Sequence, residues 1–316
     1  MADQKKILVL ADASKRSMRT VNYVKEFLSP DGNTQIVLFH VLDGVPEEYR
    51  EMADREDSRV QLQTWQSERE AHIRAYLAQI RKTLVGAGFS DSQVEIKLQP
   101  VARGIARDII KEAETGDYSL VMMSRRGMAN ALQSIVLGSV AVKLLQALSF
   151  VPLVFVGPAA PVKKILLAVD ASESSRKAVD FMAAFLGGQE YEICIFHAIL
   201  GLGAVDFEVP EGAPAECSRR KLPDTGLEAF KIKTGQMMLQ VRERLLAAGF
   251  SPDNITEKIV SGAVSRSEAI VCEAEAGGYS TIVVGRRGLS RLEGFFMGRV
   301  GHKVVYGGKN FTVWVV

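Results

Sequence analysis

The sequence carries one long pattern twice in the same order, and this internal repeat limits the possible folds more than any other feature. KKILVLADAS at 5–14 returns as KKILLAVDAS at 163–172, and EAETGDYSLVMMSRRG at 112–127 returns as EAEAGGYSTIVVGRRG at 273–288. Two shorter matches, IVLFHVL with ICIFHAI and AGFS with AGFS, fall between them in the same order. The nearly constant spacing between the copies indicates that one domain was duplicated and fused.

The two copies meet at VGPAAPVKK, residues 156–164. Two prolines and a glycine among small residues disfavour both helix and strand there. We therefore predict two domains, 1–158 and 159–316. Because the join is short, we expect the domains to pack together rather than to swing freely.

Each copy alternates short apolar runs with helical stretches. The predicted strands cover residues 7–11, 34–42, 94–98, 120–123 and 151–156 in the first copy, and lie near 164–169, 191–199, 255–260, 281–284 and 311–316 in the second. The predicted helices of the first copy cover about 15–28, 58–85, 105–114 and 139–148, with Ser14 as the cap of the first helix. This alternation is typical of βαβ units, so we predict an α/β fold with doubly wound, Rossmann-like parallel sheets.

The composition excludes several classes of protein. Hydrophobic residues make up 47% and charged residues 24%, the balance of a soluble globular protein, and a net charge of +2 is too small to argue for a nucleic acid or an anionic membrane surface. No apolar run reaches the roughly 18 residues that a membrane helix needs. We expect a cytoplasmic protein with no membrane partner and no nucleic-acid partner.

The residues that most often bind metals are scattered. The three cysteines, Cys194, Cys217 and Cys272, form no CxxC pattern, and we expect buried or incidental thiols rather than a disulfide framework or a zinc site. The four histidines form no pair at helical spacing. We predict no metal-ligating residues of the protein's own and no catalytic residues.

Several residues follow the ends of predicted strands in both copies. Ligands of doubly wound sheets bind outside the carboxyl ends of the strands, where the strand order reverses. An acid follows the first strand, a histidine and a small apolar residue end the second, and a glycine loop follows the fourth. The first two features are Asp12 and Asp170, His40-Val41 and His197-Ala198. For the histidines we favour a structural, hydrogen-bonded role.

The glycine loop of the second copy contains Gly285, Gly288 and Gly298. Glycines let a backbone approach a ligand closely, and free N–H groups at the start of the following helix favour phosphate. The arginine pairs 125–126 and 286–287 add positive charge, although solvated loop charge is the simpler interpretation of both pairs. On these residues alone, tight turns and a phosphate site stay equally open.

Taken in order, these segments resemble the universal stress protein family. That family combines a first strand ending in an acid, a small residue and Ser with the motif G-x2-G-x9-G-[ST]. The second copy reads LLAVDAS and G-x2-G-x9-G-R, and the first reads LVLADAS and S-x2-G-x10-G-S. The strand ends HV and HA and the closing PLVFV also fit, so the resemblance covers essentially the whole chain, twice.

The resemblance implies two five-stranded parallel sheets of strand order 3-2-1-4-5, with ATP bound in some members at the carboxyl ends of strands 1 and 4. Mg²⁺ would arrive with the ATP. In the second copy the implied nucleotide-binding residues are Asp170, Ala198, Gly285, Gly288, Gly298, Arg299 and Val300. In the first copy they are Asp12, Val41, Gly127, Gly138 and Ser139.

Two departures from the family motif favour the second copy as the nucleotide site. In the first copy Ser124 replaces the first glycine and the loop is one residue longer. In the second, Arg299 replaces the small hydroxyl residue, and Arg299 can pair with a phosphate, fill the site or point to solvent. A scaffold with degenerate sites and a slow ATP-hydrolysing enzyme stay open as alternatives to a nucleotide-binding stress-response module.

The resemblance also implies dimerisation through the last strand. Two domains in one chain satisfy that contact internally, as a pseudo-dimer, and a further homodimer is left open. The end of the chain, residues 311–316, is apolar enough that an unpaired strand there would invite aggregation. We predict that it packs against residues 151–156.

Overall fold

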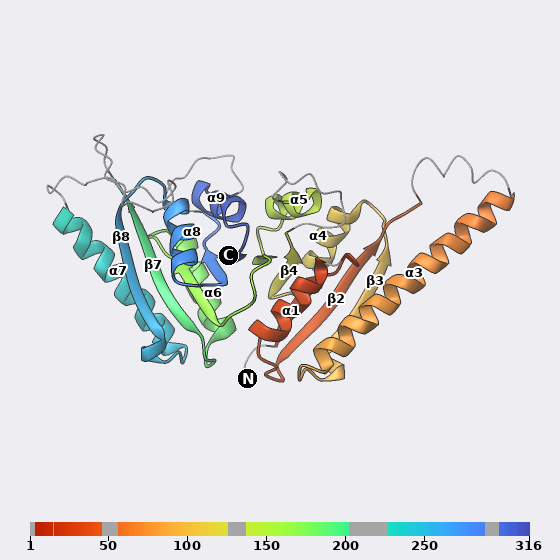
Figure 1. Cartoon of the computed structure of the whole chain (residues 1–316), viewed down its shortest axis with the longest axis horizontal. Coiled ribbons are helices and arrows are strands. Elements are labelled where there is room, and N and C mark those ends of the chain that lie inside the picture. Colours follow the sequence, from red (N-terminus) through yellow and green to blue (C-terminus); the bar gives the residue numbers. More distant parts are fainter. Residues whose placement is uncertain (1–3, 15, 46–55, 126–136, 202–226, 288–296) are drawn as a thin grey trace. The chain divides into compact units, whose positions relative to one another are not determined.

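The computed structural model describes the chain apart from residues 1–3, 15, 46–55, 126–136, 202–226 and 288–296. Chain contacts divide it into two compact units, Met1–Val151 and Pro152–Val316 (Figure 1).

The first unit is a parallel sheet with the strand order β3-β2-β1-β4. The described elements are β1 (Lys5–Leu10), α1 (Ser17–Phe27), β2 (Thr34–Leu42), α3 (Glu56–Val85), η2 (Asp91–Gln93), β3 (Val94–Pro100), α4 (Ile105–Thr115), β4 (Leu120–Ser124) and α5 (Ser139–Ala147). β1 lies inside the sheet with a parallel neighbour on each side, and its residues Ile7, Leu8 and Val9 are at most 1% exposed. A continuous apolar run is what a strand covered on both faces requires.

The second unit repeats this arrangement and adds one strand. Its described elements are β5 (Leu153–Val156), β6 (Lys164–Ala168), α6 (Glu173–Leu186), β7 (Glu192–Leu200), α7 (Leu227–Ala247), η4 (Pro252–Asn254), β8 (Ile255–Ala263), α8 (Arg266–Ala276), β9 (Thr281–Val284), α9 (Arg299–Gly307) and β10 (Thr312–Val315). The strand order is β5-β10-β9-β6-β7-β8, in which only β5 runs antiparallel to its neighbour β10.

This topology confirms the predicted α/β fold, and β8-β7-β6-β9-β10 is the predicted strand order 3-2-1-4-5; the second unit differs from the prediction in one added strand that runs antiparallel. The fifth strand of the first copy, β5, falls in the second unit, where Phe155 pairs with Val313. All four residues of β10 are buried, and an apolar strand edge left unpaired is costly, which explains the added pairing. The predicted contact between residues 311–316 and 151–156 is therefore confirmed.

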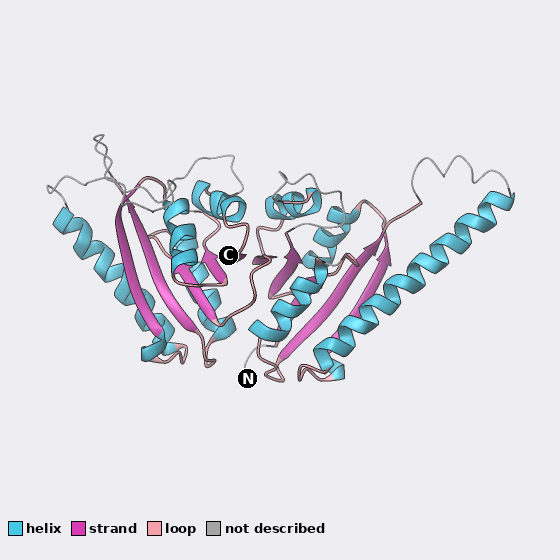
Figure 2. Ribbon diagram, viewed as in Figure 1, coloured by secondary structure: helices cyan, strands magenta, loops and turns pink. Residues whose placement is uncertain are grey.

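Helices cover both faces of the strands in each unit (Figure 2). α1 packs against α3 and α4 against α5, and the second unit repeats these pairs as α6 with α7 and α8 with α9. The chain moves outward from β1 to β3 and then returns to β4, so right-handed crossovers place the two helix pairs on opposite faces. The strand order reverses between β1 and β4, and again between β6 and β9.

The serine of the DAS segment caps the first helix in the second copy only. Ser172 is the N-cap of α6, and its hydroxyl oxygen accepts the Ser175 N–H at 3.1 Å. In the first copy the helix begins at Ser17 with Arg16 as its N-cap, so the prediction of Ser14 as the cap is wrong, although the Ser14 hydroxyl oxygen accepts the Ser17 N–H at 3.2 Å in the preceding turn.

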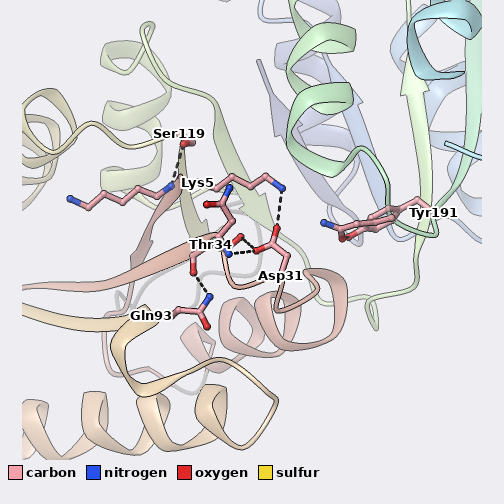
Figure 3. A network of polar contacts seen from close by, with 9 residues as sticks. Lys5, Asp31, Thr34, Gln93, Ser119 and Tyr191 are labelled. Atoms are coloured by element: carbon pink, nitrogen blue, oxygen red, sulfur yellow. Dashed lines mark hydrogen bonds and ion pairs between the residues drawn. The ribbon is translucent and has the colours of Figure 1, made fainter. Parts of the chain in front are cut away.

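A polar network fixes the amino end of the first sheet, opposite the edge where ligands of such folds bind (Figure 3). The Asp31 carboxylate accepts hydrogen bonds from Lys5 Nζ at 3.1 Å, Thr34 Oγ1 at 2.8 Å and the Asn33 N–H at 3.0 Å. Gln93 Nε2 donates to the Thr34 carbonyl oxygen at 2.9 Å. These bonds join β1, β2 and η2, and they hold the strands in register.

The expectation for the cysteines is wrong at one position. Cys194 is free and buried in β7, as expected. Cys272 of α8, however, is disulfide-bonded. Cys217 lies outside the described residues.

Candidate functional site

A pocket opens in the second unit at the carboxyl ends of β6, β7 and β9, where the strand order reverses. Its walls are completed by the starts of α6, α8 and α9. The pocket is open on one side and has a volume of about 50 Å³. At roughly 10–15 Å³ per water molecule, it has room for a few waters, so a larger ligand has to lie mainly over its open side.

Asp170 lies in this pocket, directly after β6, as the sequence predicted. Its Oδ1 accepts the Ser172 N–H at 3.0 Å, and its own N–H donates to Ser175 Oγ at 3.0 Å. No other bond reaches this carboxylate from the residues that the structure describes. Its second oxygen can therefore accept a hydrogen bond from a ligand hydroxyl or amino group.

A histidine supports the acid-bearing turn in each copy. His197 Nδ1 lies 2.7 Å from the carbonyl oxygen of Val169, and His40 Nδ1 lies 2.5 Å from that of Ala11. A carbonyl oxygen only accepts, so Nδ1 is the protonated ring nitrogen in both residues. Both rings are buried, and the predicted structural role of the histidines is confirmed.

The described glycines of the loop in the second copy, Gly285 and Gly298, mainly determine its backbone path, and only Gly285 lines the pocket. Gly285 lines the pocket, and a Cβ there would lie 2.8 Å from the Ser174 backbone at the start of α6. Gly298 caps α9, and its N–H donates to the Arg286 carbonyl oxygen at 2.7 Å. Gly288 lies outside the described residues. Glycine at position 285 is thus explained by close packing against α6.

The start of α9 reaches the pocket through Val300 and Gly301. Arg299, the first residue of α9, is exposed and does not line the cavity. Of the alternatives that the sequence left open for Arg299, filling the site is therefore ruled out in this structure. Ala198, at the end of β7, lines the opposite side as predicted.

The arginine pairs do not behave as simple loop charge. Arg125 and Arg286 are 6% and 7% exposed, which contradicts the solvated-loop interpretation for the first arginine of each pair. Burial lowers the pKa of Arg125 to about 10 and also lowers the pKa of Arg286. Arg287, by contrast, is exposed and lines the pocket.

Sequence reasoning missed one pocket residue, Arg266 at the start of α8. Its Nε donates to the Ala198 carbonyl oxygen at 3.3 Å, which holds the guanidinium at the end of β7. A signal was available, because the first copy has Ile105 at the matching position of α4. Because both copies have the same fold, the fold does not require the positive charge of Arg266 at this position of the helix.

The first copy arranges its matching residues differently. Asp12 Oδ1 accepts both the N–H and the hydroxyl of Ser14, at 3.1 and 2.6 Å, and Ala13 adopts a positive φ of 57°. The Tyr76 hydroxyl reaches this turn from α3 and lies 2.5 Å from Ser17 Oγ. Burial raises the pKa of Tyr76, and the negative charge of Asp12 adds to the rise. Asp12 thus receives the Ser14 hydroxyl in addition to the bond within the turn that Asp170 also receives, and its second oxygen has no bond from the described residues.

The other predicted residues of the first copy lie at the expected strand and helix ends. Val41 is buried in β2, Gly138 caps α5, and Ser139 is the first residue of α5. Gly127 lies outside the described residues. Ser124 is buried at the end of β4, so the first copy accommodates a side chain where a Cβ at Gly285 would meet backbone.

Comparison with known proteins identifies the class of the chain. The model of the Universal stress protein family matches residues 4–156 and again residues 161–316. The chain therefore belongs to the universal stress protein family and carries its domain twice in tandem. A search of curated proteins found no match.

Solved structures agree with this assignment. A universal stress protein from Archaeoglobus fulgidus DSM 4304 is 18% identical, covering 99% of this chain and 98% of that chain with a TM-score of 0.62. A functionally unknown protein from Pseudomonas aeruginosa PAO1 is 15% identical over 99% and 92%, with a TM-score of 0.52. A universal stress protein in complex with cAMP is 22% identical over 48% and 94%, with a TM-score of 0.34. The first two support the fold.

Among the described residues, no set of three or more His, Cys, Asp or Glu side chains is placed to hold a metal ion. No helix in the described part of the chain is long and apolar enough to cross a membrane.

Proposed function

We propose that the second copy binds an adenine nucleotide of the ATP type, with its ribose and base near Asp170 and Ala198 and its phosphates toward α9. The observation that carries this proposal is the pocket at the β6 and β9 strand ends, which combines one carboxylate with two arginines, Arg266 and Arg287. A carboxylate suits ribose hydroxyls or an amino group, and guanidinium groups suit phosphate. In the stress-response role that the family suggests, nucleotide occupancy would regulate the protein.

Mg²⁺ would reach this site as part of the Mg–ATP complex. Magnesium keeps several of its waters and usually binds through phosphates plus one or two carboxylates. Asp170 has one carboxylate oxygen without a bond from the described residues. In this proposal that oxygen contacts the ribose or the base, so phosphate oxygens and water molecules would hold the ion.

The proposal is tested by titrating Mg–ATP into protein that has first been freed of nucleotide. Asp170→Ala removes the pocket carboxylate, and Asp12→Ala is the matched change in the first copy. We expect Asp170→Ala to weaken ATP binding roughly 10-fold to 100-fold, the value of one or two charged hydrogen bonds, and Asp12→Ala to leave it nearly unchanged. Thermal unfolding of both variants controls for damage to the turn.

Two results would overturn the proposal. One is the absence of binding heat from the wild-type protein at millimolar ATP. The other is loss of ATP binding in Asp12→Ala with binding retained in Asp170→Ala, which would place the site in the first copy.

A further inference from the structure

The surface of α7 carries large apolar side chains where its counterpart α3 carries alanine. When the two helices are aligned on the AGFS segments that follow them, Ile232 corresponds to Ala71 and Leu239 to Ala78. All four residues are exposed, Ile232 by 62% and Leu239 by 54%. Alanine suffices for the helix of the first copy, so the packing of the domain does not explain the two large side chains of the second.

α7 packs against α6 and β7, and two arginines show which of its flanks faces the edge of the sheet. On one flank, Arg244 Nε pairs with Asp180 Oδ1 of α6 at 2.5 Å. On the other, Arg242 Nη1 donates to the Ile255 carbonyl oxygen of β8 at 3.0 Å. β8 is the outermost strand of this unit, so the flank of Arg242 faces the edge of the sheet (Figure 1).

Three apolar residues lie on the flank of Arg242. Leu239 and Leu246 are three and four residues away from Arg242 in the sequence, a spacing that puts side chains on the same side of a helix. Ile232 lies about two helical turns before Leu239, just as Leu246 lies about two turns after it. Ile232, Leu239 and Leu246 thus form a stripe along α7, in which Leu246 is half-buried.

The edge strand adds a fourth apolar residue to this stripe. Arg242 also pairs with Glu257 of β8 at 3.6 Å, and Ile259, two residues farther along, points to the same face of the strand. Ile259 is 46% exposed, whereas its counterpart Leu98 is half-buried, because α3 packs against the edge strand β3 itself. We call Ile232, Leu239, Leu246 and Ile259 the edge patch.

The stripe on α7 complements itself when a second α7 packs against it in the antiparallel direction. With Leu239 of both chains at the centre, Ile232 of one chain meets Leu246 of the other at each end. The equal spacing of the three residues makes this pairing symmetric. A two-fold axis at Leu239 then relates the two chains, which is the commonest symmetry of protein oligomers.

The charged residues beside the stripe fit the same register. Arg242 of one chain falls opposite Gly235 of the other. Glu243 falls opposite Gln236, whose amide group can donate a hydrogen bond to it. Neither charged residue faces a like charge, so the pairing removes apolar surface from water without electrostatic repulsion across the contact.

We propose that two molecules of this chain associate through the edge patch, with their α7 helices antiparallel about Leu239. This contact differs from the strand pairing that the family resemblance implied, because the last strand β10 is already paired with β5. No residue of the edge patch lines the pocket. The self-association therefore stands independently of the proposed nucleotide site.

The first test is sedimentation equilibrium of the full chain over a wide range of protein concentrations. The wild-type chain should dimerise reversibly. Leu239→Ala installs the residue of the first copy and should weaken dimerisation roughly 30-fold to 1,000-fold, because both chains lose a leucine from one interface. Val60→Ala is the matched control, since it shortens an apolar residue of α3 that is 59% exposed, and it should leave the dimerisation constant unchanged.

The second test fixes the register of the two helices. Because Leu239 meets its own counterpart on the axis, Leu239→Cys should link two chains by a disulfide under mild oxidation. Val60→Cys, at a similarly exposed position outside the edge patch, should give no more linked dimer than the wild-type chain does. Thermal unfolding of each variant checks that the fold is intact.

Three results would overturn the proposal. The first is a wild-type chain that stays monomeric up to millimolar concentration. The second is a wild-type dimer that Leu239→Ala does not weaken, which would place the contact elsewhere on the molecule. The third is weakening by Leu239→Ala without disulfide linkage of Leu239→Cys, which would exclude the antiparallel register.

Discussion

His197 donates a hydrogen bond from Nδ1 to the carbonyl oxygen of Val169 across a distance of 2.7 Å, and this bond joins the carboxyl ends of β7 and β6 next to Asp170. The first copy repeats it between His40 and Ala11. Because each histidine contacts the residue just before the acid, it fixes the backbone from which the candidate nucleotide-binding carboxylate projects.

Replacing His197 with Ala should destabilise the protein. The change leaves the buried Val169 carbonyl oxygen without its side-chain donor, which costs about 1–3 kcal/mol. His197→Asn keeps an N–H donor near the position of Nδ1 and should recover part of the loss. Urea unfolding of the three proteins measures the effect, and equal stability of His197→Ala and the wild type would show that the bond has no energetic role.

Gly116 and Gly235 should respond to alanine in opposite directions. A Cβ at Gly116 would lie 2.1 Å from the Tyr118 ring, whose hydroxyl donates to Glu112 at 2.6 Å, so Gly116→Ala should cost about 1–3 kcal/mol through overpacking. A Cβ at Gly235, inside α7, meets nothing within 4 Å. Gly235→Ala should therefore raise stability by about 0.5–1 kcal/mol. Denaturant unfolding tests both changes, and a destabilised Gly235→Ala would contradict this account of α7.

The network around Asp31 should make stability depend on acid pH (Figure 3). Burial raises the pKa of Asp31, but hydrogen bonds from Thr34, Lys5 and Asn33 outweigh it and leave the pKa below its usual value of 3.8. A carboxyl group whose pKa falls on folding adds stability above its unfolded pKa, and that stability is lost as the pH falls through the folded pKa. At pH 6 the Asp31→Asn variant should be less stable by about 1 kcal/mol.

The difference between Asp31→Asn and the wild type should shrink as the pH falls below about 4, because the unfolded chain takes up a proton there before the folded protein does, and it should be lost once the pH is below the folded pKa. Thermal unfolding at a series of pH values measures it. A difference that stays constant down to pH 2 would mean that the charge of Asp31 does not contribute.

The fold could be predicted from the sequence because its signals are local and occur twice. The run Ile7–Leu10 and its copy Ile165–Ala168 indicate buried parallel strands, and the acids that follow them lie at the predicted edge of the sheet. The assignment of residues 153–156 to the second unit could not be predicted from the local sequence pattern. An apolar strand pairs with whichever free edge reaches it, and that choice depends on the three-dimensional arrangement rather than on the strand's own residues.

The candidate site could be predicted only in part. Asp170 and Ala198 follow directly from strand ends, whereas Arg266 begins the helix that follows β8, and this helix lies over β7 and β6 only because of the crossover to β9. The sequence analysis also failed to predict that Arg125 and Arg286 are buried. A charged residue that follows a strand is expected to be solvated unless its neighbours in the folded structure are known.

The number of ATP molecules bound per chain tests the central claim most directly. Nucleotide-free protein at known concentration is titrated with Mg–ATP by calorimetry. The protein concentration is set high enough that the end point gives the number of ATP molecules bound per chain. The account predicts saturation at one ATP per chain, from the site at Asp170 in the second copy. Saturation at two per chain, or no saturable binding at millimolar ATP, would contradict it.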